Sequence, residues 1–308
     1  MYNLKCFLAS NSAKGFVSRF GECYLPEEGW QVYIIKGGPG TGKSSFMKRV
    51  VQSLKGSEAV VEAYCASDPD SLDGVILPES RRAFMDGTSP HVVEPRLPGV
   101  CENLLDLGRF WDVEALRQKS AEIISATAEN KACHRRAAEY IKNAGRLFPE
   151  DFSREGAGAE LIAKHIPEKG GSGRMLHAFL GGVTPLGVEY FTKSVSARTT
   201  VISGGRDADG IIKNIANAAK MRGFDGFVFE NPILPHLTDG VFIPELSFFA
   251  VKDCFIPQSS EIDRLLAQAS SEIAKAKEIH DLLEGFYISA MDYAAVDRFI
   301  WEFLSTKF

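Results

Sequence analysis

The sequence contains no hydrophobic run approaching the roughly 20 residues that a membrane-spanning helix needs. Its first residues, MYNLKCFLASN, carry no basic flank and no long apolar core, so we expect no signal peptide. The net charge is −5, with 35 Lys and Arg against 40 Asp and Glu, which argues against a general nucleic-acid binder. These absences predict a cytoplasmic protein that neither crosses a membrane nor generally binds nucleic acid.

The cysteines lack any pattern typical of a metal site or a disulfide framework. None of the six shows CxxC spacing or close pairing, so we expect reduced thiols, as in cytosolic proteins. Cys133 and His134 are neighbours on a predicted helix and point in different directions, which makes a metal site there unlikely to form. The chain has 308 residues, which is long enough for two domains of ordinary size.

One stretch, VYIIKGGPGTGKSSF at residues 32–46, has the order of a strand, a loop and a helix. Residues 32–35 are apolar and mostly β-branched, which predicts a buried strand. Residues 37–44, here called the phosphate loop, fit the pattern G-x-x-x-x-G-K-[ST] at each fixed position. Apolar residues then recur at helical spacing from Phe46 to Leu54. The flanking elements favour a nucleotide-binding loop over a Gly-rich turn that binds nothing.

The residue types of the phosphate loop suit a polyphosphate. Glycines let backbone amides approach the phosphate oxygens, and the N-terminus of the following helix favours an anion. Lys43 is expected to reach the β- and γ-phosphates, and the Ser44 hydroxyl to ligate Mg²⁺. The guanine-specifying pattern N-K-x-D is absent, so ATP is expected rather than GTP. The predicted nucleotide-binding residues are Gly37, Gly38, Pro39, Gly40, Thr41, Gly42, Lys43, Ser44 and Ser45.

Two acids compete to complete the Mg²⁺ site. Asp86 follows an apolar predicted strand at residues 82–85, from which it would reach the metal beside the phosphate loop. Asp68 follows another predicted strand, at residues 59–64, and begins an acidic loop. His91 is a candidate general base or γ-phosphate sensor. The alternatives are a turn-forming role for Asp86 and local hydrogen bonding for His91. The predicted catalytic residues are Lys43, Asp86 and His91, and the predicted metal ligands are Ser44, Asp86 and Asp68.

The second half of the chain repeats the first. Residues 235–245, PHLTDGVFIPE, align without a gap with residues 69–79, PDSLDGVILPE, and share Pro, Asp-Gly-Val and Pro-Glu in one register. Residues 201–205, VISGG, correspond to residues 34–38, IIKGG. An internal repeat of this kind indicates the tandem duplication of one α/β unit.

The repeated loop, GGRDADGI at residues 204–211, has no Lys-Ser pair. It places Asp207 and Asp209 where phosphates would lie. Two carboxylates without a compensating lysine repel a polyphosphate. We therefore expect one ATP per chain, bound in the first half.

Alternating strands and helices predict an α/β fold with parallel sheets. We expect two tandem P-loop NTPase-like units, each with an appended helical hairpin, and place the boundary at the Gly-rich residues 169–173. The predicted domains are residues 1–168 and 174–308. Helices are predicted over residues 101–111, 113–147 and 151–166. A stripe from Ile262 to Leu283, spaced three and four apart, predicts a further helix that packs against one at residues 288–303.

Four motifs together resemble a poorly characterised bacterial family of P-loop ATPase-like proteins built as two tandem halves. They are KGGPGTGKS, CxSDPDSLDGVIxPE, DGTxPHVVxP and LGxFWD. The match is close from Phe7 to about Asp112 and looser in the second half. The resemblance implies ATP binding and hydrolysis but names no physiological substrate. This chain departs from the family at residues 206–211, where a second phosphate loop is common.

Three functions follow from these patterns. The first is a Mg²⁺–ATP-binding NTPase that hydrolyses ATP at one site per chain, with the second half as a scaffold or regulatory unit. The second is a phosphotransferase, in which the acidic loop at residues 68–73 and His91 line the pocket of a small acceptor. The third is an ATP-gated interaction module without turnover, whose helices move as ATP binds. A protein partner or a homodimer is compatible with each.

Overall fold

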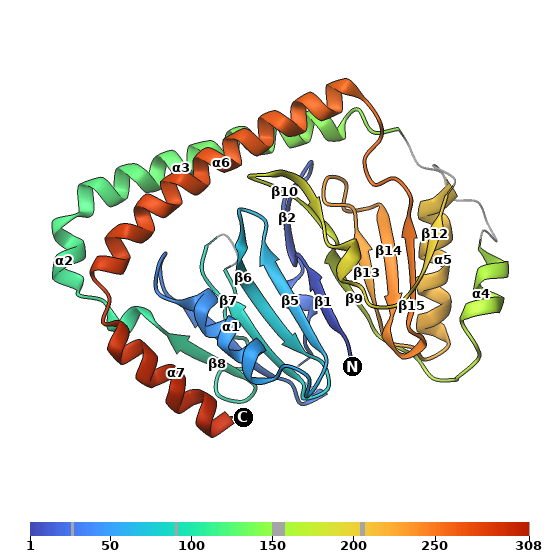
Figure 1. Ribbon diagram of the computed structural model, residues 1–308, viewed down its shortest axis with the longest axis horizontal. Coiled ribbons are helices and arrows are strands. Elements are labelled where there is room, and N and C mark those ends of the chain that lie inside the picture. Colours follow the sequence, from blue (N-terminus) through green and yellow to red (C-terminus); the bar gives the residue numbers. More distant parts are fainter. Residues whose placement is uncertain (26–27, 90–91, 150–157, 204–206, 308) are drawn as a thin grey trace.

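The computed structural model describes residues 1–25, 28–89, 92–149, 158–203 and 207–307. It is an α/β protein with two mixed sheets side by side and a long pair of helices that runs past both (Figure 1). The predicted catalytic residue His91 and residues 204–206 of the repeated loop lie outside the described residues. The α/β class predicted from the sequence is confirmed.

The first sheet contains six strands. Their order is β1 (Asn3–Cys6), β5 (Val60–Cys65), β6 (Asp68–Leu77), β7 (Arg82–Asp86), β4 (Gln31–Lys36) and β8 (Glu102–Asp106). β6 runs antiparallel to both of its neighbours, so the expectation of a parallel sheet is wrong here. Residues 66–67 and 78–81 are the only connections of β6, and they are too short for the crossover that a parallel neighbour needs.

The second sheet has the same strand order, without a counterpart of β8. It runs β9 (Met175–Phe179), β13 (Gly226–Glu230), β14 (Thr238–Ile243), β15 (Phe248–Lys252) and β12 (Arg198–Ile202). β14 is antiparallel to both neighbours, as β6 is. The register also agrees, because Gly74 faces Ala63 in the first sheet and Gly240 faces Phe229 in the second. Both glycines belong to the Asp-Gly pairs that align in the sequence.

The two halves meet through reciprocal backbone hydrogen bonds. Phe7 N donates to Phe179 O, and Phe179 N donates to Phe7 O, each at 2.8 Å. Across the same junction the Arg19 guanidinium donates to the buried carboxylate of Glu230 at 2.8 Å. Each half then forms a hairpin. The hairpins are β2 (Ala9–Ser12) with β3 (Gly15–Ser18), and β10 (Gly181–Thr184) with β11 (Gly187–Tyr190).

One helix packs on each sheet in equivalent positions, α1 (Lys43–Ser53) in the first half and α5 (Ala208–Met221) in the second. Lys48 of α1 donates to Asp70 O at 2.5 Å, and Lys213 of α5 donates to His236 O at 2.8 Å. The two acceptors occupy the same place in the aligned segments 69–79 and 235–245. The repeat therefore extends to side-chain contacts that hold each helix to its sheet.

The long helices α3 (Ser120–Gly145) and α6 (Ser260–Ser289) pack against each other, one from each half (Figure 1). Their seam buries Ile141 and Ile273, and Arg136 pairs with Glu272 at 2.6 Å. The expectation that each half carries its own helical hairpin is therefore wrong. An apolar stripe shows that a helix has a packed face but does not identify the partner that covers it.

The helices that follow this pair cross to the opposite half. α4 (Ala159–His165) contributes Ile162 to the core around α5, and α7 (Tyr293–Lys307) contributes Phe303 to the core around α1. The division into residues 1–168 and 174–308 stays a prediction, since each half contributes a helix to the other's core. Among the described residues, the remaining short elements are α2 (Val113–Gln118) and the single-turn helices Phe20–Glu22, Gly108–Phe110, Thr192–Ser194 and Pro244–Leu246.

Two local predictions are wrong. Residues 101–111, predicted as a helix, form the edge strand β8 and a single helical turn, because the backbone of β8 pairs with β4 from Val32 to Lys36. The acidic segment 68–74, predicted as a loop, forms the first part of β6. Tertiary pairing with a neighbouring strand decides the structure of both segments. Of the helix predicted at residues 151–166, α4 accounts for its C-terminal part, and residues 151–157 lie outside the described residues.

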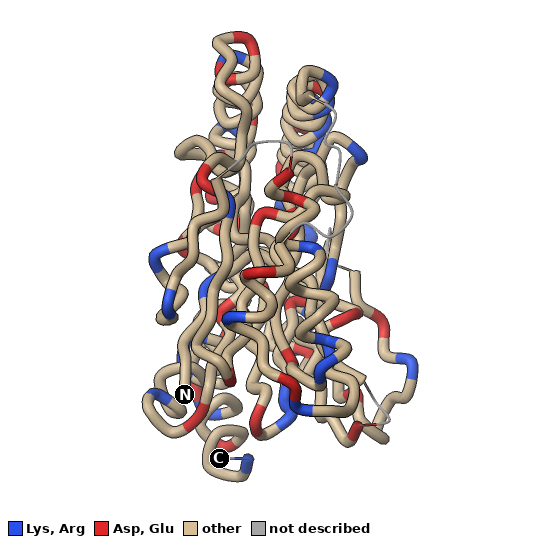
Figure 2. Tube along the Cα trace, turned by 90° about the vertical axis from the view of Figure 1, so that its right-hand side faces the viewer, with Lys and Arg blue, Asp and Glu red and all other residues tan. Residues whose placement is uncertain are grey.

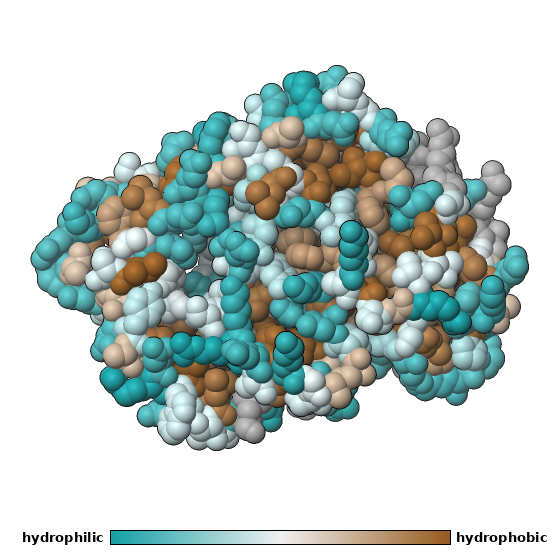
Figure 3. Space-filling model, viewed as in Figure 1, coloured by the Kyte–Doolittle hydropathy of each residue, from teal (hydrophilic) through white to brown (hydrophobic). Residues whose placement is uncertain are grey.

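The surface carries both signs of charge. Figure 2 shows acidic and basic residues interspersed along the trace, and Figure 3 shows apolar patches interrupted by hydrophilic residues on the face that it views. None of the helices in the described part of the chain is both long and apolar enough to cross a membrane.

Candidate functional site

The phosphate loop connects the carboxyl end of β4 to the first residue of α1, in the order that the sequence predicts. Gly40 has φ +65° and Gly42, the residue that precedes α1, has φ +89°. These positive φ angles are costly for residues with a Cβ, so glycine is required for the loop to turn into the helix. The first amides of α1 have no helical acceptors, and they therefore present donors at the loop.

Lys43 lies over the phosphate loop. Its ammonium donates to Gly37 O at 3.0 Å and to Gly38 O at 2.7 Å. Thr41 Oγ1 also donates to Gly38 O, at 2.9 Å. These bonds close the loop on itself and hold the lysine at its mouth, with 12% of the side chain exposed.

Asp86 ends β7, the strand beside β4, and therefore lies at the same edge of the sheet as the phosphate loop. Its Oδ2 is 3.6 Å from Lys43 Nζ. Its Oδ1 accepts hydrogen bonds from the amide of Thr88 at 2.8 Å and from the Thr88 hydroxyl at 2.5 Å. The structure thus brings together two of the three predicted catalytic residues, and Thr88 orients the carboxylate of one.

Ser44 and Ser45 lie in the first turn of α1. The Ser44 hydroxyl accepts a hydrogen bond from Leu72 N of β6 at 3.0 Å, whereas Ser45 is exposed. At the equivalent place in the second half, Asp209 Oδ1 accepts from Thr238 N at 2.5 Å. Leu72 and Thr238 occupy the same position in the aligned segments, so the contact between helix and strand is repeated with a carboxylate in place of a hydroxyl.

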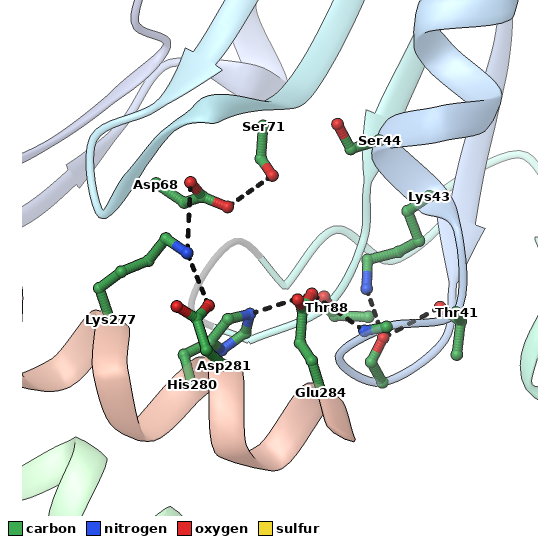
Figure 4. A network of polar contacts seen from close by, with 12 residues as sticks. Thr41, Lys43, Ser44, Asp68, Ser71, Thr88, Lys277, His280, Asp281 and Glu284 are labelled. Carbon is green, nitrogen blue, oxygen red and sulfur yellow. Dashed lines mark hydrogen bonds and ion pairs between the residues drawn. The ribbon is translucent and has the colours of Figure 1, made fainter. Parts of the chain in front are cut away.

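Asp68 faces α6. It accepts a hydrogen bond from Ser71 Oγ at 2.7 Å, and its Oδ1 is 3.7 Å from Lys277 Nζ. Lys277 also pairs with Asp281 on the same helix, at 2.6 Å. Figure 4 shows this network, with Lys277, His280 and Glu284 of α6 turned towards the strand and the loop of the first half. The sequence predicts Asp68 as a metal ligand but does not predict its contact with α6.

The end of α6 covers the phosphate loop, which the sequence analysis missed. Glu284 Oε1 accepts a hydrogen bond from Gly40 N at 3.2 Å, and the Tyr293 hydroxyl at the start of α7 donates to Gly40 O. A Cβ on Gly40 would lie 2.8 Å from Ile288 Cγ1, and one on Gly38 would lie 3.1 Å from the Tyr287 ring. No local pattern in the sequence identifies the loop as the partner of these residues.

A hollow of about 530 Å³ lies on the β8 side of the phosphate loop, lined by residues 109–112 and 289–292. The Trp111 ring reaches the loop, since a Cβ on Gly38 would lie 3.2 Å from it. Trp111 Nε1 is buried and has no hydrogen-bond partner among the residues that the structure describes. The Arg109 guanidinium lies on the rings of Phe110 and Phe299, 4.7 and 4.6 Å from their centres. The hollow thus combines aromatic faces, a cation and an unused N–H donor.

Ser44 and Asp86 supply oxygen donors at the end of the loop and beside it. Within the described ranges, no three His, Cys, Asp or Glu side chains come together in a way that could hold a metal ion. Hard cations such as Mg²⁺ prefer oxygen ligands and accept one or two carboxylates together with phosphate oxygens and water. The hydroxyl of Ser44 and the carboxylate of Asp86 are oxygen donors of this kind.

Comparison with protein-family models, with curated proteins and with solved structures gives no match. The argument for a function therefore depends on the residues of this chain alone.

Proposed function

We propose that this chain is a cytoplasmic P-loop NTPase-like protein that binds Mg²⁺–ATP at residues 37–45 and hydrolyses it. The observation that carries the proposal is the position of Lys43 beside Asp86, at the ends of neighbouring strands, around a loop whose positive-φ glycines turn into a helix N-terminus. An ammonium, free helix amides and a carboxylate at one sheet edge are the groups that phosphoryl transfer needs for charge stabilisation.

The strand order gives a direction to the bound nucleotide. Asp86 follows β7 on one side of β4, and Trp111 follows β8 on the other. The γ-phosphate end lies towards Lys43 and Asp86, and the nucleoside end lies towards the hollow at Trp111. There the aromatic side chains that line the hollow suit a purine.

This proposal gives a role to four polar side chains near the loop. Lys43 moves from its own loop carbonyls to the β- and γ-phosphate oxygens, which carry more negative charge. Ser44 and Asp86 would hold a Mg²⁺ ion through their side-chain oxygens. Thr88 holds the Asp86 carboxylate in orientation. A bound Mg²⁺ supplies charge neutralisation as the terminal phosphoryl group is transferred.

The second half is a degenerate P-loop-like unit in this proposal, and it binds no nucleotide in its own loop. α5 begins at Ala208 as α1 begins at Lys43, so alanine takes the place of the loop lysine. The register of the sheets puts Lys252 at the position of Asp86, because Met85 faces Gly74 and Val251 faces Gly240. The chemistry of the first site is therefore lost at both positions, and the second half acts as a scaffold or regulatory unit.

Titration calorimetry tests the proposal. With Mg²⁺ present, ATP binds with a stoichiometry of one per chain, and Lys43→Ala weakens binding by at least roughly 100-fold, since it removes a charge-assisted contact to the phosphates. Lys55→Ala, which removes an exposed lysine after α1, is the matched control and binds like the parent. Binding by Lys43→Ala at the parent affinity, or a stoichiometry of two, would contradict the proposal. Phosphate release that Asp86→Asn abolishes supports hydrolysis.

An ATP-gated module without turnover is a second candidate, because α6 reaches the loop from the other half of the chain. Tight ATP binding by the parent with negligible phosphate release favours gating over hydrolysis.

A further inference from the structure

The end of α6 contacts the candidate site with two side chains of opposite charge. Glu284 is hydrogen-bonded to a loop amide, and Lys277, two turns earlier, lies beside Asp68 (Figure 4). Both contacts join α6 to residues of the first half. The proposed function assigns the amide to phosphate. The carboxylate belongs to Asp68, which the sequence predicts as a metal ligand together with Ser44 and Asp86.

Glu284 has the chemistry of a phosphate oxygen. Its Oε1 accepts from Gly40 N, in the part of the loop whose amides would wrap the phosphate chain. The nearby His280 ring, and next the Gly40 amide and Lys277, hold the pKa of Glu284 below its ordinary value, so the group is an anion. A carboxylate and a phosphate cannot accept from the same N–H in the same place.

Lys277 places a positive charge beside Asp68. Its ammonium is 3.7 Å from Asp68 Oδ1 and 2.6 Å from Asp281 Oδ1, so it pairs with one carboxylate of the first half and with one of its own helix. A cation bound at Asp68 would compete with it.

We propose that the end of α6 is an internal substitute for Mg²⁺–ATP: Glu284 takes the place of phosphate on Gly40 N, and Lys277 takes the place of the cation at Asp68. Mg²⁺–ATP must expel both side chains before it binds. This inference rests on the proposed function and adds a regulatory element to the same site.

The expulsion would act on a defined part of α6. The helix has 30 residues and a length of about 45 Å. Within this length, α6 is fixed to α3 at Ala276, whose carbonyl accepts from Asn130 Nδ2 at 2.7 Å. The part after this bond, residues 277–289, contacts the site and leads into α7, whose Tyr293 also bonds the loop. Nucleotide binding would therefore release residues 277–289 while residues 260–276 stay packed.

Affinity measurements separate the two substitutions. Glu284→Ala is expected to bind ATP about tenfold more tightly than the parent, with or without Mg²⁺, because it removes a charge-assisted competitor for Gly40 N. Lys277→Ala is expected to bind about twofold more tightly, and only with Mg²⁺, since its partly exposed pair with Asp68 is long, at 3.7 Å, and therefore weak. Glu278→Ala, which removes an exposed acid from the same helix, is the control and binds like the parent.

Hydrogen exchange gives a second readout on the intact chain. In the parent, ATP speeds amide exchange in residues 277–289 and leaves residues 260–276 unchanged. In the double variant E284A/K277A, residues 277–289 exchange rapidly before ATP is added. If the parent binds ATP but Glu284→Ala binds equally or more weakly, this inference is wrong and the proposed function stands. If neither protein binds ATP, the proposed function fails and the inference fails with it.

Discussion

Gly40→Ala offers a direct test of whether α6 covers the phosphate loop. Gly40 has φ +65°, and an added Cβ would lie 2.8 Å from Ile288 Cγ1 and 3.1 Å from the backbone oxygen of Glu284. The substitution therefore adds two separate costs, one in the loop itself and one against the helix. Only the second depends on α6.

The backbone cost and the steric cost differ in size, and only the steric cost can be relieved by a second substitution. An alanine in the left-handed region costs about 1–2 kcal/mol. Overpacking against Ile288 and Glu284 costs about 1–3 kcal/mol more, so Gly40→Ala should lower the free energy of unfolding by about 2–5 kcal/mol. Ile288→Ala makes room for the new methyl group, and by itself costs less than a buried isoleucine because 46% of Ile288 is exposed. In the double variant, relief of the steric clash should restore about 1–2 kcal/mol of the free energy of unfolding.

Urea unfolding of the parent, both single variants and the double variant gives the coupling energy between the two sites. We expect the double variant to be more stable than the sum of the single effects predicts. Additive effects within about 0.5 kcal/mol would mean that Ile288 does not lie on Gly40. In that case the covering of the loop by α6, and the competition by Glu284, would lose their structural basis.

Two further predictions concern the first half. Phe303→Ala should lower the free energy of unfolding by about 3–5 kcal/mol, because the ring packs on Tyr33, Phe46 and Phe84, whereas Trp301→Ala, at a side chain 71% exposed, should change it little. Equal urea midpoints for the two variants would contradict the packing of α7 on the first sheet. Burial raises the pKa of Glu102, but hydrogen bonds from the Leu97 amide, the Tyr24 hydroxyl and the Arg96 amide lower it. The net effect is a pKa below the ordinary value of 4.5. The ionised Glu102 carboxylate therefore stabilises the fold fully above about pH 4.5, and this stabilisation is lost as the pH falls through the lower pKa of the folded state. In Glu102→Gln, the urea midpoint should therefore decline less steeply in acid than in the parent. An unchanged decline would contradict this assignment.

Local requirements made part of the site predictable. The phosphate loop needs glycines at specific backbone angles and a strand and helix on either side, and all of these are encoded within residues 32–54. Asp86 could be predicted because it ends an apolar strand, and strands that end at one sheet edge bring their following residues together. The internal repeat was visible because residues 69–79 and 235–245 retain the same turn and strand residues in one register.

Contacts between segments distant in the sequence explain the predictions that were wrong or missing. β8 is an edge strand because β4 offers it a partner, and no local pattern in residues 102–106 distinguishes it from a helix. The stripe of α6 correctly predicted a packed helix, but α3, more than 100 residues away, covers it. Glu284 and Trp111 reach the site only because α6 and β8 are placed there by those distant contacts. A residue that functions through such a contact leaves no local signal in the sequence.

Each half has a carboxylate near the start of its helix α1 or α5, but the two carboxylates are held in different ways. In the second half, Asp209 belongs to α5 itself, is 5% exposed, and is fixed by Thr238 N and by Lys213 at 2.7 Å. In the first half the equivalent position is the neutral Ser44, and the carboxylate comes from Glu284, on a helix that belongs to the other half, with 36% of its side chain exposed. A buried carboxylate with two partners excludes a polyphosphate permanently, whereas an exposed one on a separate helix can be displaced by it. In the proposals made above, the repeated unit therefore binds no nucleotide in one copy and is regulated in the other, because each copy holds a carboxylate at this position in a different way.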